Sequence, residues 1–158
     1  MRNVQRLTIG GLMAALIMLF TLFLRIHTAV GYIHLGDSVI FLSAVLLGPY
    51  AALSAAVGSA MADLFGGSPL YILPTFFLKG LMGWLAGRFL RGSIIQRLLV
   101  FCLCESIMVL GYALFESLVY NWPTALAEIP MNCLQAAGGV AFGMLFCVLA
   151  ERINQEVA

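Results

Sequence analysis

Long apolar runs dominate the chain, and short stretches that hold glycine, proline and polar residues separate them. A helix that crosses the ~30 Å hydrocarbon layer needs about 20 apolar residues, at a rise of ~1.5 Å per residue. By this measure the pattern predicts an all-α integral membrane protein. We expect one transmembrane domain over 1–158, a bundle of six helices at approximately 6–25, 38–48, 50–65, 72–90, 97–119 and 129–151.

The second predicted helix, 38–48, is too short to cross a membrane alone, and Gly48-Pro49 separates it from the third. The pair is therefore either a short helix followed by a full one or a single broken helix. Six crossings explain the charges better, because they leave only Arg25 outside and put the other arginines on the cytoplasmic side. The N- and C-termini are then cytoplasmic, and loops 26–37, 66–71 and 120–128 lie outside. The arginines on the cytoplasmic side are Arg2, Arg6, Arg88, Arg91, Arg97 and Arg152.

Composition supports a membrane protein and removes several other classes. The chain is 63% hydrophobic and 9% charged with a mean hydropathy of +1.05, which leaves too little polar surface to coat a soluble globule. A net charge of +1 provides no field for nucleic acid. The four cysteines lack CxxC spacing and a neighbouring histidine, so we assign no metal, no cofactor and no disulfide.

No catalytic motif is present: HExxH, GxxxxGK[ST] and GxSxG are all absent. We therefore assign no catalytic residue and do not expect an enzyme. Without a phosphate-binding loop the chain cannot hydrolyse ATP itself. Uphill movement of a solute would draw its energy from a partner or from an ion gradient.

Small residues form flat strips on two of the predicted helices. The first helix holds the pairs Gly10/Ala14 and Gly11/Ala15, each four residues apart, so that another helix can approach closely. The third helix is richer still in small residues, and internal packing could use its strips entirely. The strip on the first helix could pack against either a partner protein or another helix of the same chain.

Charged and amide side chains inside the predicted helices are the candidates for chemistry, because each charge at mid-bilayer costs about 2.5 to 3.5 kcal/mol. Lys79, the only lysine, lies a third of the way along its helix and either binds a solute or extends to the interface. Glu105, Tyr112 and Glu116 share one face of the fifth helix, at spacings of i, i+7 and i+11.

The last helix carries a pair of amides. Pro130 is predicted to start this helix, and Asn132 and Gln135 then share a face that Gly139 and Gly143 continue. Amides in this arrangement either orient a heterocycle or join helices by hydrogen bonds.

The first outer loop contains the stretch 31–37 (GYIHLGD), which mixes glycines with Tyr32, His34 and Asp37. This mixture suits a loop that faces a ligand better than a plain connector. N-capping of the next helix explains either Asp37 or Ser38. Asp63 fits a solvated helix end, and the roles of His27 and His34 stay open between ligand contact, pH sensing and simple exposure.

An ordered series of short segments resembles the S components of energy-coupling factor (ECF) vitamin transporters, in the branch that takes flavins, hydroxymethylpyrimidine and vitamin B6. The series covers nearly the whole chain. Its segments are 31–37, FLSA at 41–44, LGP at 47–49, GSAMADL at 58–64, PT at 74–75, KGLMG at 79–83 and PMNCLQ at 130–135.

The resemblance implies a six-helix protein of a prokaryotic plasma membrane that binds one vitamin-like molecule near its outer end, under the lid loop 26–37. It implies assembly with a transmembrane T component and two ABC-type ATPases, through the surface that Gly11 and Ala15 provide. The residues above and the family together favour a substrate site made of Tyr32, His34, Lys79, Tyr112, Glu116, Asn132 and Gln135.

Two other interpretations compete. A non-transporting scaffold similar to the MreD-like cell-shape proteins would need partner-binding helices but no pocket around Lys79 and Asn132. An intramembrane enzyme would use Glu105, Glu116 and His34, but no nucleophile or metal set accompanies them. The residues suit flavin, pyrimidine and pyridoxine ligands alike and do not choose among these three vitamins.

Overall fold

The computed structural model describes residues 3–27, 32–90 and 92–157, with the backbone alone at 151 and 153–157. Helices account for nearly all of these residues, and two short strands form the only sheet within them. In chain order the elements are α1 (Asn3–Phe23), β1 (Arg25–His27), β2 (Tyr32–His34), α2 (Gly36–Leu47), α3 (Ala51–Gly66), α4 (Ile72–Phe89), α5 (Ile94–Val119) and α6 (Trp122–Val157), with single 3-10 turns at Gly48–Tyr50 and Pro69–Tyr71.

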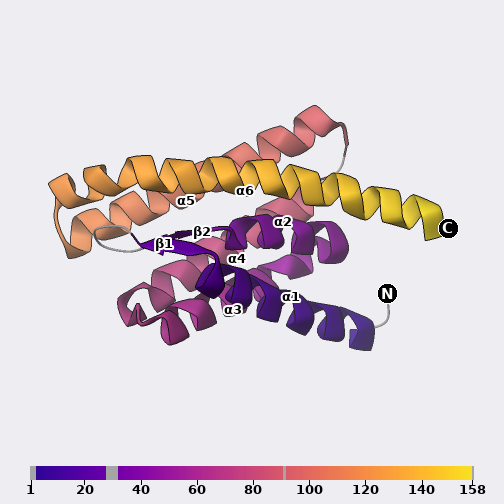
Figure 1. The fold of residues 1–158 in the computed structure, drawn as a ribbon, viewed down its shortest axis with the longest axis horizontal. Helices are drawn as coiled ribbons and strands as arrows, with labels where there is room; N and C mark the ends of the chain where they lie inside the picture. Colours follow the sequence, from indigo (N-terminus) through magenta and orange to yellow (C-terminus); the bar gives the residue numbers. More distant parts are fainter. Residues whose placement is uncertain (1–2, 28–31, 91, 158) are drawn as a thin grey trace.

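The helices form an elongated bundle in which the start of α1 and the end of α6 lie at the same end (Figure 1). The antiparallel strands β1 and β2 lie toward the opposite end, with Arg25 opposite His34 and His27 opposite Tyr32. The chain connects α1 to α2 through this hairpin, so the predicted lid region contains a small sheet on both sides of residues 28–31, which lie outside the described residues.

Five stretches of the described chain are long and apolar enough to cross a membrane: Asn3–Phe23, Gly36–Gly66, Pro69–Phe89, Ile94–Val119 and Trp122–Ala150. Their outward surface is apolar as well, with Leu7 80% exposed, Leu118 79% and Phe77 69%. Lipid is the solvent that such a surface requires. The protein is therefore a multi-pass membrane protein.

The stretch Gly36–Gly66 contains two helices that run in opposite directions. Asp37, at the start of α2, contacts Lys79 on α4, and Gly48, just past the end of α2, packs against Gly87 near the end of α4. Helix α2 therefore runs parallel to α4. Helix α3 runs antiparallel to α4, since its first residue Ala51 faces Gly83. With 12 residues, α2 is about 18 Å long and spans only part of a bilayer.

The expected start of the last helix at 129 is wrong, and so is the expected role of Pro130. Helix α6 begins at Trp122 and contains Pro130 in its interior. The side chain of Asn121 caps the helix, because its Oδ1 accepts a hydrogen bond of 2.9 Å from the Thr124 N–H. Pro123 occupies the first turn, where proline loses no intrahelical bond. These additional turns bring Glu128 into the bundle as a helical residue.

The fifth helix also begins earlier than expected, at Ile94 rather than 97. Ser93 caps it, with its Oγ accepting a hydrogen bond of 3.3 Å from the Gln96 N–H. A Ser or Asn cap a few residues before the apolar run therefore gives the true start of both helices.

Glycines allow the helices at the centre of the bundle to approach closely. A Cβ at Gly87 would clash with the Gly48 carbonyl, and one at Gly58 would clash with the Ala14 carbonyl of α1. Such contacts are the small-residue packing typical of membrane helices. The small residues of α3 therefore pack against other helices of the same bundle. On α1, Gly10 also packs inward against Ser54, whose Oγ donates a 2.9 Å hydrogen bond to the Gly10 carbonyl.

Candidate functional site

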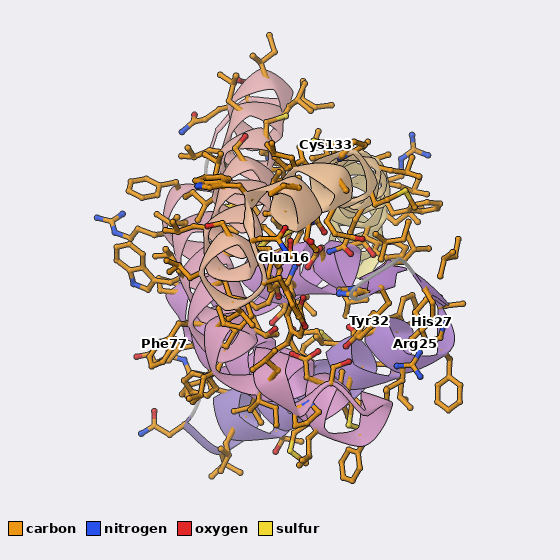
Figure 2. All side chains as sticks on the ribbon, turned by 90° about the vertical axis from the view of Figure 1, so that its left-hand side faces the viewer. Arg25, His27, Tyr32, Phe77, Glu116 and Cys133 are labelled. Atoms are coloured by element: carbon orange, nitrogen blue, oxygen red, sulfur yellow. The ribbon has the colours of Figure 1, made fainter. Side chains whose placement is uncertain are left out.

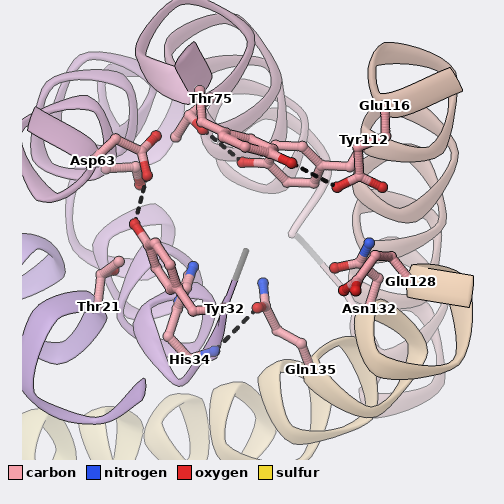
Figure 3. A pocket seen from close by; sticks show the side chains of 12 residues that line it. Thr21, Tyr32, His34, Asp63, Thr75, Tyr112, Glu116, Glu128, Asn132 and Gln135 are labelled. Atoms are coloured by element: carbon pink, nitrogen blue, oxygen red, sulfur yellow. Dashed lines mark hydrogen bonds between the residues drawn. The ribbon is translucent and has the colours of Figure 1, made fainter. Parts of the chain in front are cut away.

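A polar pocket lies between the hairpin and the helices, at the end of the bundle away from the termini. Figure 2 views this end, with Glu116 and Tyr32 toward the middle and Phe77 and Cys133 on the outside. Helices α1 and α3 to α6, strand β2 and the Pro69–Tyr71 turn all contribute to the wall (Figure 3). The lining residues are Thr21, Tyr32, His34, Ser59, Asp63, Tyr71, Thr75, Tyr112, Glu116, Glu128, Asn132 and Gln135.

The structure brings together all the substrate-site residues expected from the sequence except Lys79. Six of them line this one pocket: Tyr32, His34, Tyr112, Glu116, Asn132 and Gln135. They come from distant segments, with His34 and Gln135 separated by 101 positions, so the tertiary fold brings them together.

Lys79 lies next to the pocket and is fully buried, and Asp37 neutralises its charge. Its Nζ lies 2.6 Å from the Asp37 Oδ1, and both side chains are 0% exposed. Gln135 Nε2 donates a second 2.6 Å hydrogen bond to the other Asp37 oxygen. Lys79 does not extend to the interface, because its side chain is fully buried and paired with Asp37. Asp37 is not a helix cap either, because α2 has no side-chain cap.

Two hydrogen bonds hold strand β2 over the pocket. The Tyr32 hydroxyl donates to Asp63 Oδ1 of α3 at 2.5 Å, and the His34 backbone N–H donates to Gln135 Oε1 of α6 at 3.0 Å (Figure 3). Gln135 therefore binds the lid with one end of its amide and Asp37 with the other. Asp63 is 4% exposed, so it is not the solvated helix end that the sequence suggested.

The far wall of the pocket is aromatic and hydrogen-bonded. Tyr112 shares a 2.8 Å hydrogen bond with Thr75, and the Tyr71 hydroxyl donates to Glu116 Oε1 at 3.2 Å. The Tyr71 and Tyr112 rings lie 6.1 Å apart at 51°. Two tyrosine rings fixed in this way offer a rigid surface on which a planar ligand can pack.

Sequence reasoning missed half of the pocket. Asp63 and Glu128 were placed at a helix end and in a loop. Tyr71 is expected only as part of the outer loop 66–71, and Ser59 and Thr75 only as members of the segments GSAMADL and PT. Thr21 carries no signal of its own. Asn121 as a helix cap was the one available clue for Glu128, since it moves the start of α6 far enough back to include that residue.

The cavity between these side chains has a volume of about 40 Å³, room for a few water molecules. Pockets that enclose drug-sized ligands measure roughly 300–1,000 Å³. Strand β2 is the part of the described wall that is not helical. A ring-sized ligand therefore needs more space than this arrangement of β2 leaves.

The two titratable side chains on β2 are both neutral at physiological pH. Burial, followed by the Asp63 carboxylate, raises the pKa of Tyr32, so it stays a hydrogen-bond donor. Burial lowers the pKa of His34 to about 4, and Lys79 adds to this effect while Asp37 opposes it. Neutral His34 accepts a 3.0 Å hydrogen bond from the Gly36 N–H at its Nδ1, which stabilises the turn into α2.

Breaking the buried ion pair should destabilise the fold. Lys79→Met leaves the Asp37 carboxylate buried without its cation, and we expect a loss of about 3–5 kcal/mol in the free energy of unfolding. The double variant Asp37→Asn/Lys79→Met should recover most of this loss, because no charge is then left unpaired. Unfolding of the purified protein in detergent measures both. A loss below about 1 kcal/mol in the single variant would contradict this assignment.

His34 should make the fold sensitive to mild acid. The unfolded chain binds a proton at this residue near pH 6.5, and the folded chain binds it only near pH 4. Stability is therefore lost as pH falls from 6.5 to 4, by about 3 kcal/mol. Thermal unfolding at several pH values should show a shallower decline for His34→Asn. Equal declines in His34→Asn and in the exposed-site control His27→Asn would rule out this role.

The comparisons with known proteins agree with this fold and with each other. A family model described as "ECF-type riboflavin transporter, S component" matches residues 1–152. An uncharacterized protein of Pyrococcus woesei is 37% identical over 128 residues, which are 78% of this chain and 86% of that protein.

Among solved structures, the crystal structure of the S-component for biotin from an ECF-type ABC transporter matches with a TM-score of 0.68. The match covers 98% of this chain and 95% of that one, at 22% identity, and so shows a shared fold. The family model extends over nearly the whole chain and includes every residue of the pocket. This chain therefore belongs to the ECF-type riboflavin transporter S component family.

Proposed function

We propose that this protein is the substrate-specific subunit of an ECF-type importer and binds a small vitamin or vitamin precursor, of the flavin, hydroxymethylpyrimidine or pyridoxine type. The observation that carries the proposal is the pocket beneath β2, where aromatic rings, amides, carboxyls and hydroxyls from five helices, β2 and the Pro69–Tyr71 turn converge. Two hydrogen bonds hold β2 over this pocket. An apolar bundle needs no such collection of buried polar groups for its stability. Family membership favours this function over a membrane scaffold.

We also propose six crossings with both termini in the cytoplasm. Arg6 and Arg97 line one cleft at the terminal end of the bundle, together with Gly87 and Leu90, whereas Arg25 lies at the other end beside Gly66. Positive side chains favour the cytoplasmic side of a membrane. In this orientation the pocket faces outward, where a solute would arrive.

Within the pocket, the substrate-site residues expected from the sequence have proposed roles. Tyr32 and His34 cover the ligand, and Tyr112 packs against its ring. Glu116 accepts from a ring N–H or a hydroxyl, and Asn132 and Gln135 orient the heterocycle. Lys79 supports the site through Asp37 and Gln135 rather than by touching the ligand.

The T component and the two ATPases would supply the energy for transport. On α1, Gly11 and Ala15 are exposed, and a Cβ at Gly11 would meet no atom within 4 Å. Gly11 also borders a largely apolar groove of about 470 Å³ between α1 and α3. A flat strip beside a groove is a surface that a partner helix can fill, and we propose that the T component docks there.

Binding of candidate vitamins to the purified protein tests the function directly. Riboflavin, pyridoxine and 4-amino-5-hydroxymethyl-2-methylpyrimidine should be titrated in turn, with binding followed by calorimetry. We expect one of them to bind, and Asn132→Ala to weaken it about 10- to 100-fold by removing a buried hydrogen bond. Cys133→Ala, an exposed neighbour on the same helix, is the matched control. If none binds, or if Asn132→Ala binds normally, the proposed site is wrong.

Docking can be separated from binding by enlarging the strip on α1. Gly11→Leu and Ala15→Leu should reduce co-purification with the T component and ATPases, because the added side chains keep the partner helix at a distance. The affinity of the purified subunit for its vitamin should not change. Ala141→Leu, on the exposed face of α6, is the control for added bulk alone. Full assembly with the Leu variants would place the T component elsewhere.

A further inference from the structure

The pocket is rich in carboxyls and contains no cation. Asp63, Glu116 and Glu128 belong to its lining, and no lysine or arginine does. Lys79 is the nearest buried cation, and Asp37 already neutralises it at 2.6 Å. Arg25 donates to the Gly66 carbonyl and lies 5.1 Å from the centre of the Tyr32 ring, outside the lining. The described pocket is therefore built to accept hydrogen bonds and positive charge.

Several of these acceptors have no partner. Among the described residues, Asp63 Oδ2 and Glu116 Oε2 are buried without a hydrogen bond, and each residue is 4% exposed. Thr21 Oγ1 and Ser59 Oγ, both on residues 1% exposed, are likewise unpaired. Buried polar atoms without partners are rare in folded proteins, and at a binding site they point to groups that a ligand supplies. A ligand that displaces water from these atoms has to donate hydrogen bonds to them in its place.

The unpaired carboxyl oxygens lie at opposite sides of the pocket. Asp63 projects from α3 beside Tyr32, while Glu116 and Glu128 project from α5 and α6 across the pocket (Figure 3). One oxygen of Asp63 and one of Glu116 are occupied, by the Tyr32 and Tyr71 hydroxyls. A ligand between them meets an acceptor at each edge and tyrosine rings along its faces.

We propose that the ligand is a cationic or neutral heterocycle with N–H or O–H donors on two opposite edges, and that anionic vitamins and phosphate esters are rejected. This inference rests on the proposed function and narrows its substrate class. Lys79, whose charge Asp37 already neutralises, offers no partner to an anionic group. This ligand class also separates this chain from its structural relative, the S-component for biotin, since biotin is a carboxylic acid. An anion placed here would find carboxyls and no described lysine or arginine to balance its charge, and burying an unbalanced charge in a medium of low dielectric constant is costly.

Pairs of compounds that differ by one phosphate test the proposal on the purified full chain. The pairs are riboflavin with its 5′-phosphate, pyridoxine with its 5′-phosphate, and hydroxymethylpyrimidine with its phosphate; thiamine is added as a cation and biotin as an anion. For the pair that contains the ligand, the uncharged or cationic member should bind at least about 100-fold more tightly. If a phosphate ester or biotin binds as tightly as the best-binding uncharged or cationic compound, this proposal alone is overturned. Absence of binding by every compound overturns the proposed function as well.

Neutral variants show whether the carboxyls cause the discrimination. Asp63→Asn and Glu116→Gln should each weaken binding of the preferred ligand about tenfold or more and narrow its advantage over the phosphate ester. Glu105→Gln removes an equally buried carboxyl from α5 that does not line the pocket. This control should change neither the affinity for the preferred ligand nor its advantage over the phosphate ester. A merely structural role for Asp63 and Glu116 would lower both affinities in proportion. If the ratio of the affinities for the two compounds is the same in these variants as in the unaltered protein, the proposal is overturned.

Discussion

The ion pair between Asp37 and Lys79 is the interaction on which the arrangement of the pocket depends. A charge buried in a membrane bundle is tolerated only when another charge and further hydrogen bonds compensate it. Lys79 provides the charge and Gln135 provides the hydrogen bond, so α2, α4 and α6 meet at one carboxylate. Gln135 then has its amide oxygen free to hold the His34 N–H, which places β2 over the cavity.

This arrangement explains why α2 can be so short. The helix begins at Gly36, next to the buried Asp37, and strands β1 and β2 come directly before it in the chain. The polar backbone of such a hairpin is acceptable at membrane depth only where protein surrounds it or where it lines a cavity. Both conditions hold for β2, whose residues contact α3 and α6 and line the pocket. Shortening one helix thus creates the space for a binding site.

Much of the fold is readable from the sequence, because hydrocarbon thickness forces long apolar helices and each interruption is visible. Most of the expected substrate-site residues also line the pocket, since a polar residue such as Glu116 or Asn132 inside a membrane has few other uses. The pairing of Lys79 with Asp37 was not readable, because 42 positions separate them and only packing brings them together. Pro130 was misread for a local reason: a proline after a polar loop fits a helix start, yet the Asn121 cap begins the helix earlier.

Under the proposed function, the two hydrogen bonds that hold β2 over the pocket also limit how tightly a solute can bind. Together, one bond to a carboxylate and one between neutral groups contribute about 2–4 kcal/mol to the closed form. Entry of a ring into the 40 Å³ cavity would require β2 to move and both bonds to break, so only the open fraction of molecules would be ready to bind. That fraction lowers the apparent affinity by roughly 30- to 1,000-fold relative to a site held open. A ligand that donates to Asp63 in place of Tyr32 recovers part of this loss, so the lid itself favours solutes that replace its own hydrogen bond.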